Sequence, residues 1–520
     1  MLFNSFEFLF LFLPVVFFGF FRIAQTSHRL AALWLASASV FFYGFWNPKF
    51  VSLLLASVVF NYAMGYAIGH AAKRKSRPKA LLVFALMANL AVLGVFKYSN
   101  FFISTVNALA GGSLPLIDII LPLGISFFTF TQIAFLVDVY RGIAREYSFI
   151  HYLLFVTYFP HLIAGPVLHH KQMMPQFGAA STYCINPRHV AIGIALFSIG
   201  LAKKVLLADN CSEYSTRVFA AASRGDTLQF FEAWAGALSY TLQLYFDFSG
   251  YSDMAVGLSK MFGVDLPLNF NSPYKAKNII EFWRRWHMTL SQFLRDYLYI
   301  PLGGNRKGPL LRHANLMVTM LLGGLWHGAN WTFVVWGGLH GIFLIVNHGW
   351  QSVTKRCRGG QNRRPAFPGS FVATGLTFIV VVFAWVFFRS ENLASALLLV
   401  KGMVLWNGVS VPDTLAVRIS QLSPLMVHSE GFFPVTRLSG SLFFPLTIFG
   451  LWAVFLLPNS QELLLNPERT RRLNLLTPVI ESTGNITWEI GFKAGIFVAL
   501  LLACSLLSFS AGSEFLYFQF

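Results

Sequence analysis

Two histidines of this chain stand in settings that suit acid–base chemistry. His327 belongs to the decapeptide LLGGLWHGAN, and apolar residues continue on both sides of it. His287 belongs to a more charged stretch, EFWRRWHM. An ionisable side chain at membrane depth is costly unless it finds a partner or meets water, so it is a functional-site hypothesis by default. Imidazole has the unperturbed pKa nearest neutrality, which suits it to take up and release protons.

The composition indicates that these histidines belong to a membrane protein. The chain has 520 residues, of which 56% are hydrophobic and 12% are charged, and 56 of them are phenylalanine. A water-soluble domain could not bury so much apolar surface. Apolar runs recur from Phe8 to Leu507 without a long polar insert. We therefore predict an all-α, polytopic protein with one integral-membrane domain over residues 1–520.

Apolar segments that could enter a membrane follow one another along the chain. They lie near residues 6–22, 30–45, 50–69, 80–96, 118–138, 149–168, 190–207, 230–248, 315–346, 370–388, 392–407, 441–457 and 489–509. Several are shorter than the roughly 20 residues that cross a bilayer upright, and 315–346 is too long for one helix. We predict that some are re-entrant or broken helices, which are tolerated where protein or a watery cavity satisfies the backbone.

The charge pattern favours a membrane over nucleic acid as the reason for the net charge of +18. Basic residues cluster in short loops beside apolar runs, at 73–79, 355–364 and 468–472. This is the pattern of loops on the cytoplasmic side. The four cysteines are scattered without a CxxC pair, which predicts neither a disulfide framework nor a metal site.

The least lipid-like part of the sequence lies between Leu242 and Asn315. Asn278 followed by Glu281 resembles a capping box, which predicts a helix from there to about Tyr299. On such a helix Arg284, His287, Ser291 and Arg295 would share one polar face opposite an apolar stripe. An amphipathic helix lying in the membrane interface, without chemistry, explains the same pattern.

Three motifs carry a resemblance to a known family. They are QLYFDFSGYSDMAVG at 243–257, EFWRRWHMTLSQFLRDYLYIPLGGNRKG at 281–308 and LLGGLWHGANWTFVVWGGLHG at 321–341. Together they resemble the membrane-bound O-acyltransferase (MBOAT) family, in the bacterial subgroup of the alginate O-acetylation and peptidoglycan O-acetyltransferase membrane proteins. FPHLIAGPV at 159–167 fits the same subgroup. The resemblance extends to about Arg389 and is weak from Glu391 to Glu489.

The resemblance implies a helical core, with motifs at about 118–346, through which a tunnel crosses the membrane. Further spans would occupy 370–509, followed by a periplasmic aromatic tail at 510–520. His327 matches the family's essential histidine, which we interpret as the general base. His287 matches the second histidine of the subgroup, and we expect it to polarise the thioester carbonyl or hold the developing oxyanion.

Further residues are candidates for binding the acyl donor or lining the tunnel. They are Arg284, Arg285, Ser291, Arg295, Trp326 and Asn330. The arginines, with GGNRKG at 303–308, could offer cations to the phosphates of coenzyme A. Asp247 and Asp253 are six residues apart and would not share a helical face, so we expect charge networks with arginines rather than an acid–base pair.

The chain ends in FLYFQF, residues 515–520. An aromatic belt that anchors the last helix at the interface explains this composition. A second interpretation comes from resemblance, because a small partner protein of the related D-alanylation system ends in a similar motif whose tyrosine looks like an acyl acceptor. Tyr517 would then be an acyl relay.

The function that follows is an inner-membrane O-acetyltransferase of a bacterium, with acetyl-CoA as donor substrate and no bound cofactor or metal. The resemblance implies a periplasmic SGNH-type partner that completes O-acetylation of peptidoglycan or of an exopolysaccharide such as alginate or cellulose. Two rival classes are a polysaccharide or lipid transporter and a non-catalytic scaffold of a secretion complex. A transporter would be built from internal repeats, and the sequence shows none.

Overall fold

The computed structural model describes most of the chain. The described residues are 1–74, 76–144, 148–163, 165–357, 367–411, 427–428, 433, 435–436, 443–464, 491–509 and 515–516. They divide into two compact units. Unit 1 comprises residues 1–202, 250–269 and 460–519, and unit 2 comprises residues 203–249, 270–459 and 520.

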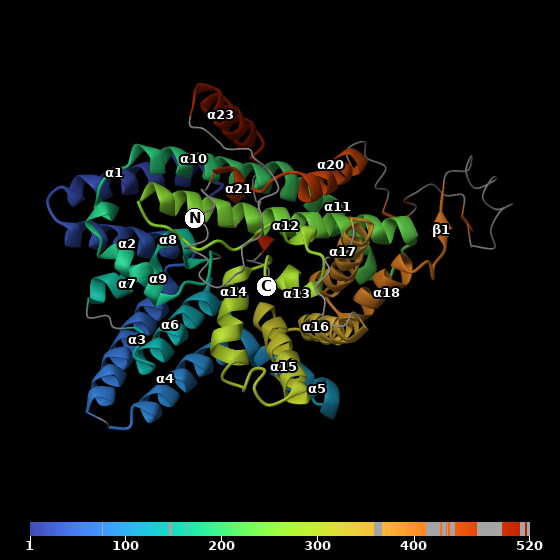
Figure 1. Ribbon diagram of the computed structural model, residues 1–520, viewed down its shortest axis with the longest axis horizontal. Coiled ribbons are helices and arrows are strands. Elements are labelled where there is room, and N and C mark those ends of the chain that lie inside the picture. The colour runs from blue at the N-terminus through green and yellow to red at the C-terminus, as the bar shows by residue number, and fades with distance from the viewer. Residues whose placement is uncertain are drawn as a thin grey trace. The chain divides into compact units, whose positions relative to one another are not determined.

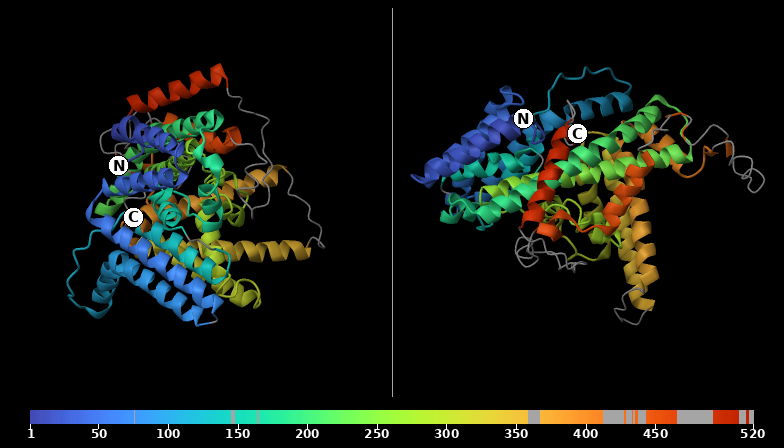
Figure 2. Two further views of the ribbon diagram at one scale, coloured as in Figure 1. Left: turned by 90° about the vertical axis from the view of Figure 1, so that its left-hand side faces the viewer. Right: turned by 90° about the horizontal axis from the view of Figure 1, so that it is seen from above.

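Unit 1 is a helical bundle that begins with the N-terminal spans (Figures 1 and 2). Its elements are η1 (Glu7–Phe12), α1 (Leu13–Ala24), α2 (His28–Gly44), α3 (Lys49–Lys73), α4 (Pro78–Leu93), η2 (Gly94–Tyr98), α5 (Ser99–Ala110), α6 (Ile125–Tyr140), α7 (Phe149–Thr157), α8 (Phe159–Leu162), α9 (His170–Phe177), η3 (Ala180–Tyr183), α10 (Pro187–Ala202), α21 (Ser460–Leu464) and α23 (Phe492–Leu507). α3, α4 and α6 pack against one another, as Figure 1 shows.

Unit 2 holds the motif-rich part of the chain. Its elements are η4 (Lys203–Ala208), α11 (Asp209–Arg224), η5 (Pro273–Lys275), α13 (Ile279–Trp283), α14 (Met288–Leu294), η6 (Arg295–Tyr299), α15 (Pro309–His327), α16 (Trp331–Cys357), α17 (Phe367–Arg389), α18 (Leu393–Met403), β1 (Val409–Ser410), β2 (Val427–His428) and α20 (Phe443–Leu456). The strands β1 and β2 pair in parallel over two residues each. The helix α12 (Phe230–Met261) contributes residues to both units.

The prediction of a polytopic helical membrane protein is confirmed. Within the described ranges, six helical stretches are long and apolar enough to cross a bilayer: Glu7–Ala24, Lys49–Lys73, Pro78–Ala110, Pro187–Arg224, Trp331–Thr354 and Gly369–Arg389. Shorter apolar helices accompany them at Ile125–Tyr140, Leu393–Met403, Phe443–Leu456 and Phe492–Leu507. These shorter helices, of 10–17 residues, are too short to span an average bilayer upright.

The predicted break in the apolar segment 315–346 is confirmed, because α15 ends at His327 and α16 begins at Trp331. The prediction of one continuous helix from Asn278 to about Tyr299 is wrong. The helix begins as expected, since the Asn278 side chain accepts a hydrogen bond from the Glu281 backbone nitrogen at 3.0 Å. It ends at Trp283, and α14 starts only at Met288. Of the four polar residues predicted on one face, Arg284 and His287 therefore lie in the break, and Ser291 and Arg295 follow it.

The apolar interior of unit 1 contains a connected polar network. The amides of Asn61 on α3 and Asn89 on α4 bond to each other in both directions, at 3.0 and 2.7 Å. Gln132 of α6 donates to the Ser57 hydroxyl at 2.9 Å and accepts from the Tyr152 hydroxyl at 3.3 Å. Hydrogen bonds of this kind hold transmembrane helices together where the hydrophobic effect does not act between them.

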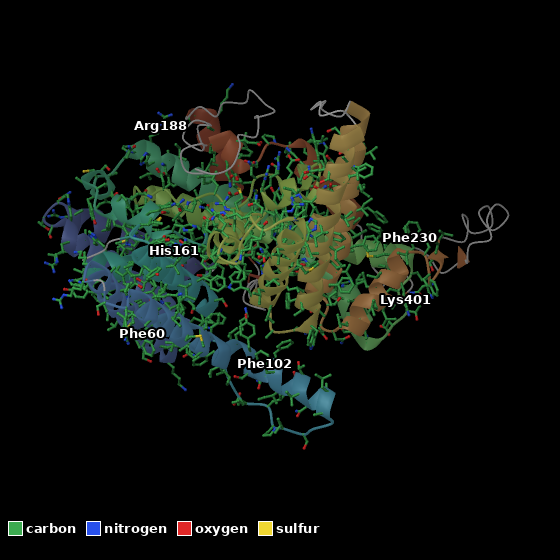
Figure 3. All side chains as sticks on the ribbon, turned by 60° about the horizontal axis from the view of Figure 1, so that its bottom comes forward. Phe60, Phe102, His161, Arg188, Phe230 and Lys401 are labelled. Atoms are coloured by element: carbon green, nitrogen blue, oxygen red, sulfur yellow. The ribbon has the colours of Figure 1, made fainter. Side chains whose placement is uncertain are left out.

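Other polar groups of unit 1 are also satisfied locally. His161, labelled in Figure 3, donates from Nε2 to the Phe155 carbonyl oxygen at 2.9 Å, since a carbonyl can only accept. This bond to a carbonyl on the preceding helix gives His161 a structural role. Asp253, on the part of α12 that belongs to this unit, accepts from the Ser460 hydroxyl at 2.6 Å.

The paired asparagines generate a stability prediction. Asn61→Leu leaves the buried Asn89 amide without its partner, so it destabilises the protein by about 1–2 kcal/mol. The double variant Asn61→Leu/Asn89→Leu removes both amides and is less destabilised than the two single losses combined. Thermal unfolding of the detergent-solubilised variants measures this difference, and fully additive losses would contradict the network.

Candidate active site

The apolar segment that contains His327 folds into a tight helical hairpin of α15 and α16. A Cβ atom built on Gly324 would collide with the carbonyl oxygen of Phe333, and one on Gly337 would collide with that of Met320. The two backbones therefore approach more closely than any larger residue permits. Small residues at helix contacts allow such packing in membranes. Gly324 of the LLGGLWHG motif and Gly337 of the WGGLHG motif thus fix the end of α15.

His327 is the last residue of α15, and the chain leaves the helical conformation at Gly328. The histidine is buried, with 5% of its surface exposed. Aromatic rings surround its imidazole: the ring centroids of Trp326, Trp336 and Phe388 lie 4.9, 5.2 and 5.1 Å away. These walls exclude bulk water, which strengthens every electrostatic interaction that the imidazole makes with a reacting group.

Asn330 holds the turn of the hairpin in place. Its Oδ1 accepts from the Thr332 backbone nitrogen at 3.0 Å, which caps the start of α16. Its Nδ2 donates to the carbonyl oxygen of Glu391, just after α17, at 2.8 Å. Both ends of the amide are therefore used to position the loop that follows His327.

His287 lies in the break between α13 and α14. Its backbone is in the left-handed region with φ of 43°, and its carbonyl oxygen accepts from the Ser291 nitrogen at 2.9 Å. A left-handed conformation is uncommon in a residue other than glycine and persists where the surroundings enforce it. His287 is 4% exposed and lies outside the six candidate membrane-spanning helices. Burial lowers the pKa of its imidazole to about 3, so the ring is neutral at neutral pH.

Arg285 enforces this break. Its Nη2 lies 2.7 Å from the Glu281 Oε1, and its Nη1 donates to the Asn271 carbonyl oxygen at 3.3 Å. The Asn271 nitrogen in turn donates to the Arg285 carbonyl oxygen at 2.9 Å. The same segment brings the ring of Phe270 to 6.1 Å from that of His287. Tertiary contacts therefore override the local tendency to continue the helix.

The two histidines meet in one buried site of unit 2. The centroids of the His287 and His327 rings are 6.3 Å apart, with the ring planes inclined by 62°. Trp326 lies beside both, its ring centroid 6.2 Å from that of His287 and 4.9 Å from that of His327. Two imidazoles at this separation can contact different atoms of one small reacting group. The structure thus brings together the two residues that the sequence singled out for chemistry.

The other predicted binding residues fall into different surroundings. Arg284 is exposed, and the Arg295 Nε is paired with the Asp296 Oδ1 at 2.8 Å. The Ser291 hydroxyl donates to the Trp286 carbonyl oxygen at 3.4 Å. Arg285 and Asn330 have the anchoring contacts described above, and Trp326 is part of the wall of the site. Tyr517 lies outside the described residues.

Several residues of the site were not predicted. Trp336 and Trp385 stack with centroids 5.7 Å apart, and Phe388 lies 5.1 Å from Trp336. His340 accepts at Nδ1 from the Trp283 Nε1 at 3.3 Å. Trp336 and His340 follow His327 on the next helix, so helical spacing could have indicated them. The contacts from α17 join distant parts of the chain, and no local pattern reveals them.

Asp247 and Asp253, the two acidic residues considered from the sequence, interact with side chains of this chain. In unit 2, the buried Lys204 Nζ lies 2.7 Å from the Asp247 Oδ1 and 2.8 Å from the Asp209 Oδ1. Asp247 therefore belongs to a charge network, as predicted, but its cation in this network is a lysine rather than an arginine. Across the described part of the chain, no three metal-ligating side chains cluster to hold a metal ion.

The helical membrane fold and the paired histidines define a class of membrane protein. Comparison with known sequences identifies this class. The profile of the MBOAT, membrane-bound O-acyltransferase family matches residues 40–388. The chain belongs to this family and is a membrane O-acyltransferase.

Several of its relatives are bacterial proteins. The chain is 44% identical over 438 residues to the peptidoglycan O-acetyltransferase of Helicobacter pylori, covering 79% of this chain and 81% of the relative. It is also 44% identical over 405 residues to the probable alginate O-acetylase AlgI of Pseudomonas aeruginosa, covering 76% and 73%. The probable alginate O-acetylase AlgI of Azotobacter vinelandii aligns over 100% of both chains at 38% identity.

The hairpin contact generates a prediction with a matched control on the same helix. Gly337→Ala places a methyl group against the Met320 backbone, so it forces the helices apart and destabilises the protein by about 1–3 kcal/mol. Gly338→Ala is the control, because its Cβ would lie 3.5 Å from the flexible end of Leu321. Thermal unfolding and acyl-transfer rate are measured for both variants. Equal behaviour of the two would contradict the close contact.

Proposed function

We propose that this chain takes acetyl groups from cytoplasmic acetyl-CoA and passes them across the bacterial inner membrane for O-acetylation of peptidoglycan or an exopolysaccharide such as alginate. The observation that carries the chemistry is the pair of buried imidazoles, His287 and His327, with ring centroids 6.3 Å apart. The names of the relatives support acetyl as the group and a cell-envelope polysaccharide as the acceptor. Acetyl-CoA supplies the acyl group as an activated thioester, so no bound cofactor or metal is required.

His327 is the general base of the proposed reaction. It takes the proton of the acceptor hydroxyl as the oxygen attacks the thioester carbonyl carbon. His287 donates a hydrogen bond to the carbonyl oxygen, on which negative charge develops. The C–O bond forms, the C–S bond breaks, and the proton passes from His327 to the departing thiolate. A neutral His287 suits this role, because one of its ring nitrogens carries a proton to donate.

The surroundings of the arginines suggest different roles in binding the donor. Arg284 is exposed and Arg295 is 40% exposed at its side chain, so both can reach phosphate groups of coenzyme A. The guanidinium of Arg285 is engaged with Glu281 and the Asn271 backbone. We assign Arg285 a positioning role for His287, and we keep Ser291 and Trp326 as residues that line the path of the acyl group.

A second protein completes the proposed pathway. The chain contains the membrane-embedded transferase, and a periplasmic SGNH-type esterase or transferase would deliver the acetyl group to the glycan. With two components, one protein carries the acetyl group across the membrane and the other recognises the polysaccharide. Peptidoglycan and alginate are both represented among the relatives at 44% identity, so we propose this class of acceptor rather than one glycan.

The C-terminal tail provides a candidate carrier between the two components. Phe515 and Leu516 are 1% and 3% exposed, and the ring of Phe515 packs edge-on against Tyr251 with centroids 4.5 Å apart. Tyr251 stacks in turn on Phe3 at 4.9 Å. A tail anchored immediately before Tyr517 supports the proposal that its phenolic oxygen accepts the acetyl group as an ester and then releases it.

Replacement of the histidines tests the proposed chemistry. His327→Gln lowers acetyl transfer by about 100- to 10 000-fold because the general base is lost, and His287→Gln lowers it by about 100- to 1000-fold because the oxyanion loses a donor. His28→Gln, at the exposed start of α2, serves as the control. Release of labelled acetyl from acetyl-CoA in proteoliposomes is measured. Normal turnover by folded His327→Gln would refute the mechanism, and absence of acetyl release by the wild-type protein would favour a transporter or scaffold.

The proposed relay has its own test. Tyr517→Phe removes only the phenolic oxygen, so it abolishes label on the enzyme tail and transfer to the periplasmic acceptor while the protein folds normally. Mass spectrometry of the C-terminal peptide after incubation with acetyl-CoA detects the ester. Full transfer by Tyr517→Phe would rule out the relay and leave the tail as an interfacial anchor.

A further inference from the structure

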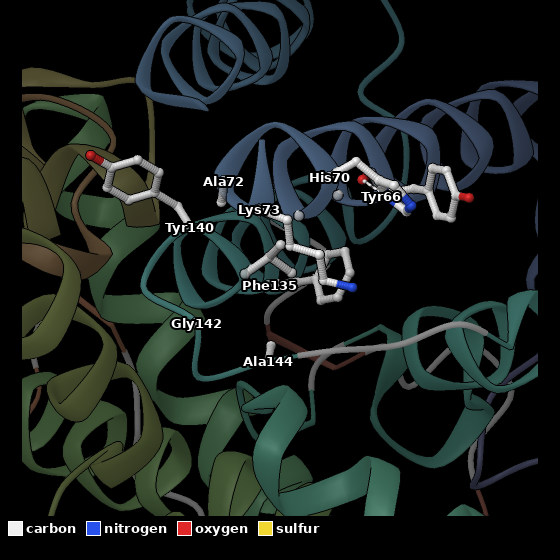
Figure 4. Close-up of a pocket in the computed structure, with 11 residues that line it drawn as sticks. Tyr66, His70, Ala72, Lys73, Phe135, Tyr140, Gly142 and Ala144 are labelled. Atoms are coloured by element: carbon white, nitrogen blue, oxygen red, sulfur yellow. Dashed lines mark hydrogen bonds between the residues drawn. The ribbon is translucent and has the colours of Figure 1, made fainter. Parts of the chain in front are cut away.

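A cavity of about 250 Å³ opens in unit 1 beside the C-terminal ends of α3 and α6 (Figure 4). Phe135, Val139 and Ala144 contribute apolar surface to it. Gly65 and Gly69 line it from α3, one helical turn apart, and Gly65 lets the Phe135 ring approach the helix, since a Cβ atom there would lie 2.5 Å from the Phe135 Cε1. A Cβ atom on Gly69 would meet the Val139 Cγ1 only at 3.7 Å. The cavity is therefore an apolar recess that a larger residue at position 69 could fill.

The same cavity has a cationic edge. Lys73, the last residue of α3, lines it together with His70, and both are drawn in Figure 4. The His70 Nδ1 lies 3.0 Å from the Tyr66 carbonyl oxygen, which can only accept, so Nδ1 carries a proton. This leaves Nε2 as the second ring nitrogen for a ligand. The recess thus combines an apolar wall with a charged rim.

The chain around the cavity carries a large excess of positive charge. The loop KRKSRPK at 73–79 has five cations, and no acidic residue occurs between Glu7 and Asp118. Arg141 directly follows α6 on the other side of the cavity. The acidic residues nearest in sequence are Asp138, which is 4% exposed, and Glu146, which lies outside the described residues. A ligand with negative charge is favoured at this edge.

We propose that this cavity binds the headgroup of an anionic phospholipid from the leaflet that faces the basic loop. Basic recesses beside transmembrane helices on the cytoplasmic side bind such headgroups, and the positive-inside pattern places this loop there. The phosphate contacts Lys73, a headgroup hydroxyl donates to the His70 Nε2, and the glycerol and upper acyl chains lie along Phe135 and Val139. The site lies within unit 1 and does not depend on the acyl-transfer reaction.

The test compares lipid binding by delipidated protein in a neutral detergent. Phosphatidylglycerol, phosphatidylethanolamine and free glycerol phosphate are titrated separately, and native mass spectrometry counts the bound molecules. We expect phosphatidylglycerol to bind most tightly. Lys73→Gln weakens phosphatidylglycerol binding about fivefold, because one cation near an anionic headgroup is lost. Gly69→Leu fills the recess and weakens binding while it leaves every charge in place.

Two variants are controls. Lys79→Gln removes an equal charge from the same loop but from a residue that does not line the cavity, so it changes binding less than Lys73→Gln. Gly349→Leu places the same side chain at an exposed helical glycine whose Cβ would meet nothing within 4 Å. All variants are checked by monodisperse elution and thermal unfolding. Equal binding of the two phospholipids, binding of glycerol phosphate as tight as that of the lipid, or equal effects of Lys73→Gln and Lys79→Gln would overturn the proposal.

Discussion

The direct contact of two helix backbones, α15 against α16, is the constraint on which the rest of the site depends. Lipid tails are as apolar as leucine, so the hydrophobic effect alone does not press these helices together. Gly324 and Gly337 remove the side chains that would separate them. The hairpin can then turn immediately after His327, where Asn330 links the start of α16 to Glu391. The glycines of the motif therefore act through geometry, and the histidine between them is the proposed general base.

Polar groups in the interior of the protein have two kinds of surroundings. The buried Lys204 has partners of opposite charge in Asp209 and Asp247. The buried imidazoles of His287 and His327 lie instead among aromatic rings. A neutral imidazole costs less to bury than an ion and can still exchange a proton.

Much of the fold and part of the site could be predicted from the sequence. Apolar runs indicated the helices, and the excessive length of 315–346 revealed the break after His327. The break at residues 284–287 was missed because Asn278 and Glu281 locally favour one helix, whereas Arg285 is held by Asn271, a contact between segments. Trp385 and Phe388 escaped notice for the same reason. Arg285 was interpreted as a donor-binding residue because a sequence shows its charge but not its partners.

A double-variant cycle tests most directly whether His287 and His327 act on one reacting group. The rate of acetyl transfer from acetyl-CoA is measured for wild type, His287→Gln, His327→Gln and the double variant, with each protein shown to be folded. Residues that act as a unit in catalysis have strongly non-additive effects. The account predicts that the double variant is no slower than the slower single variant, within about twofold. A double variant slowed by the product of the two single losses would contradict a shared site.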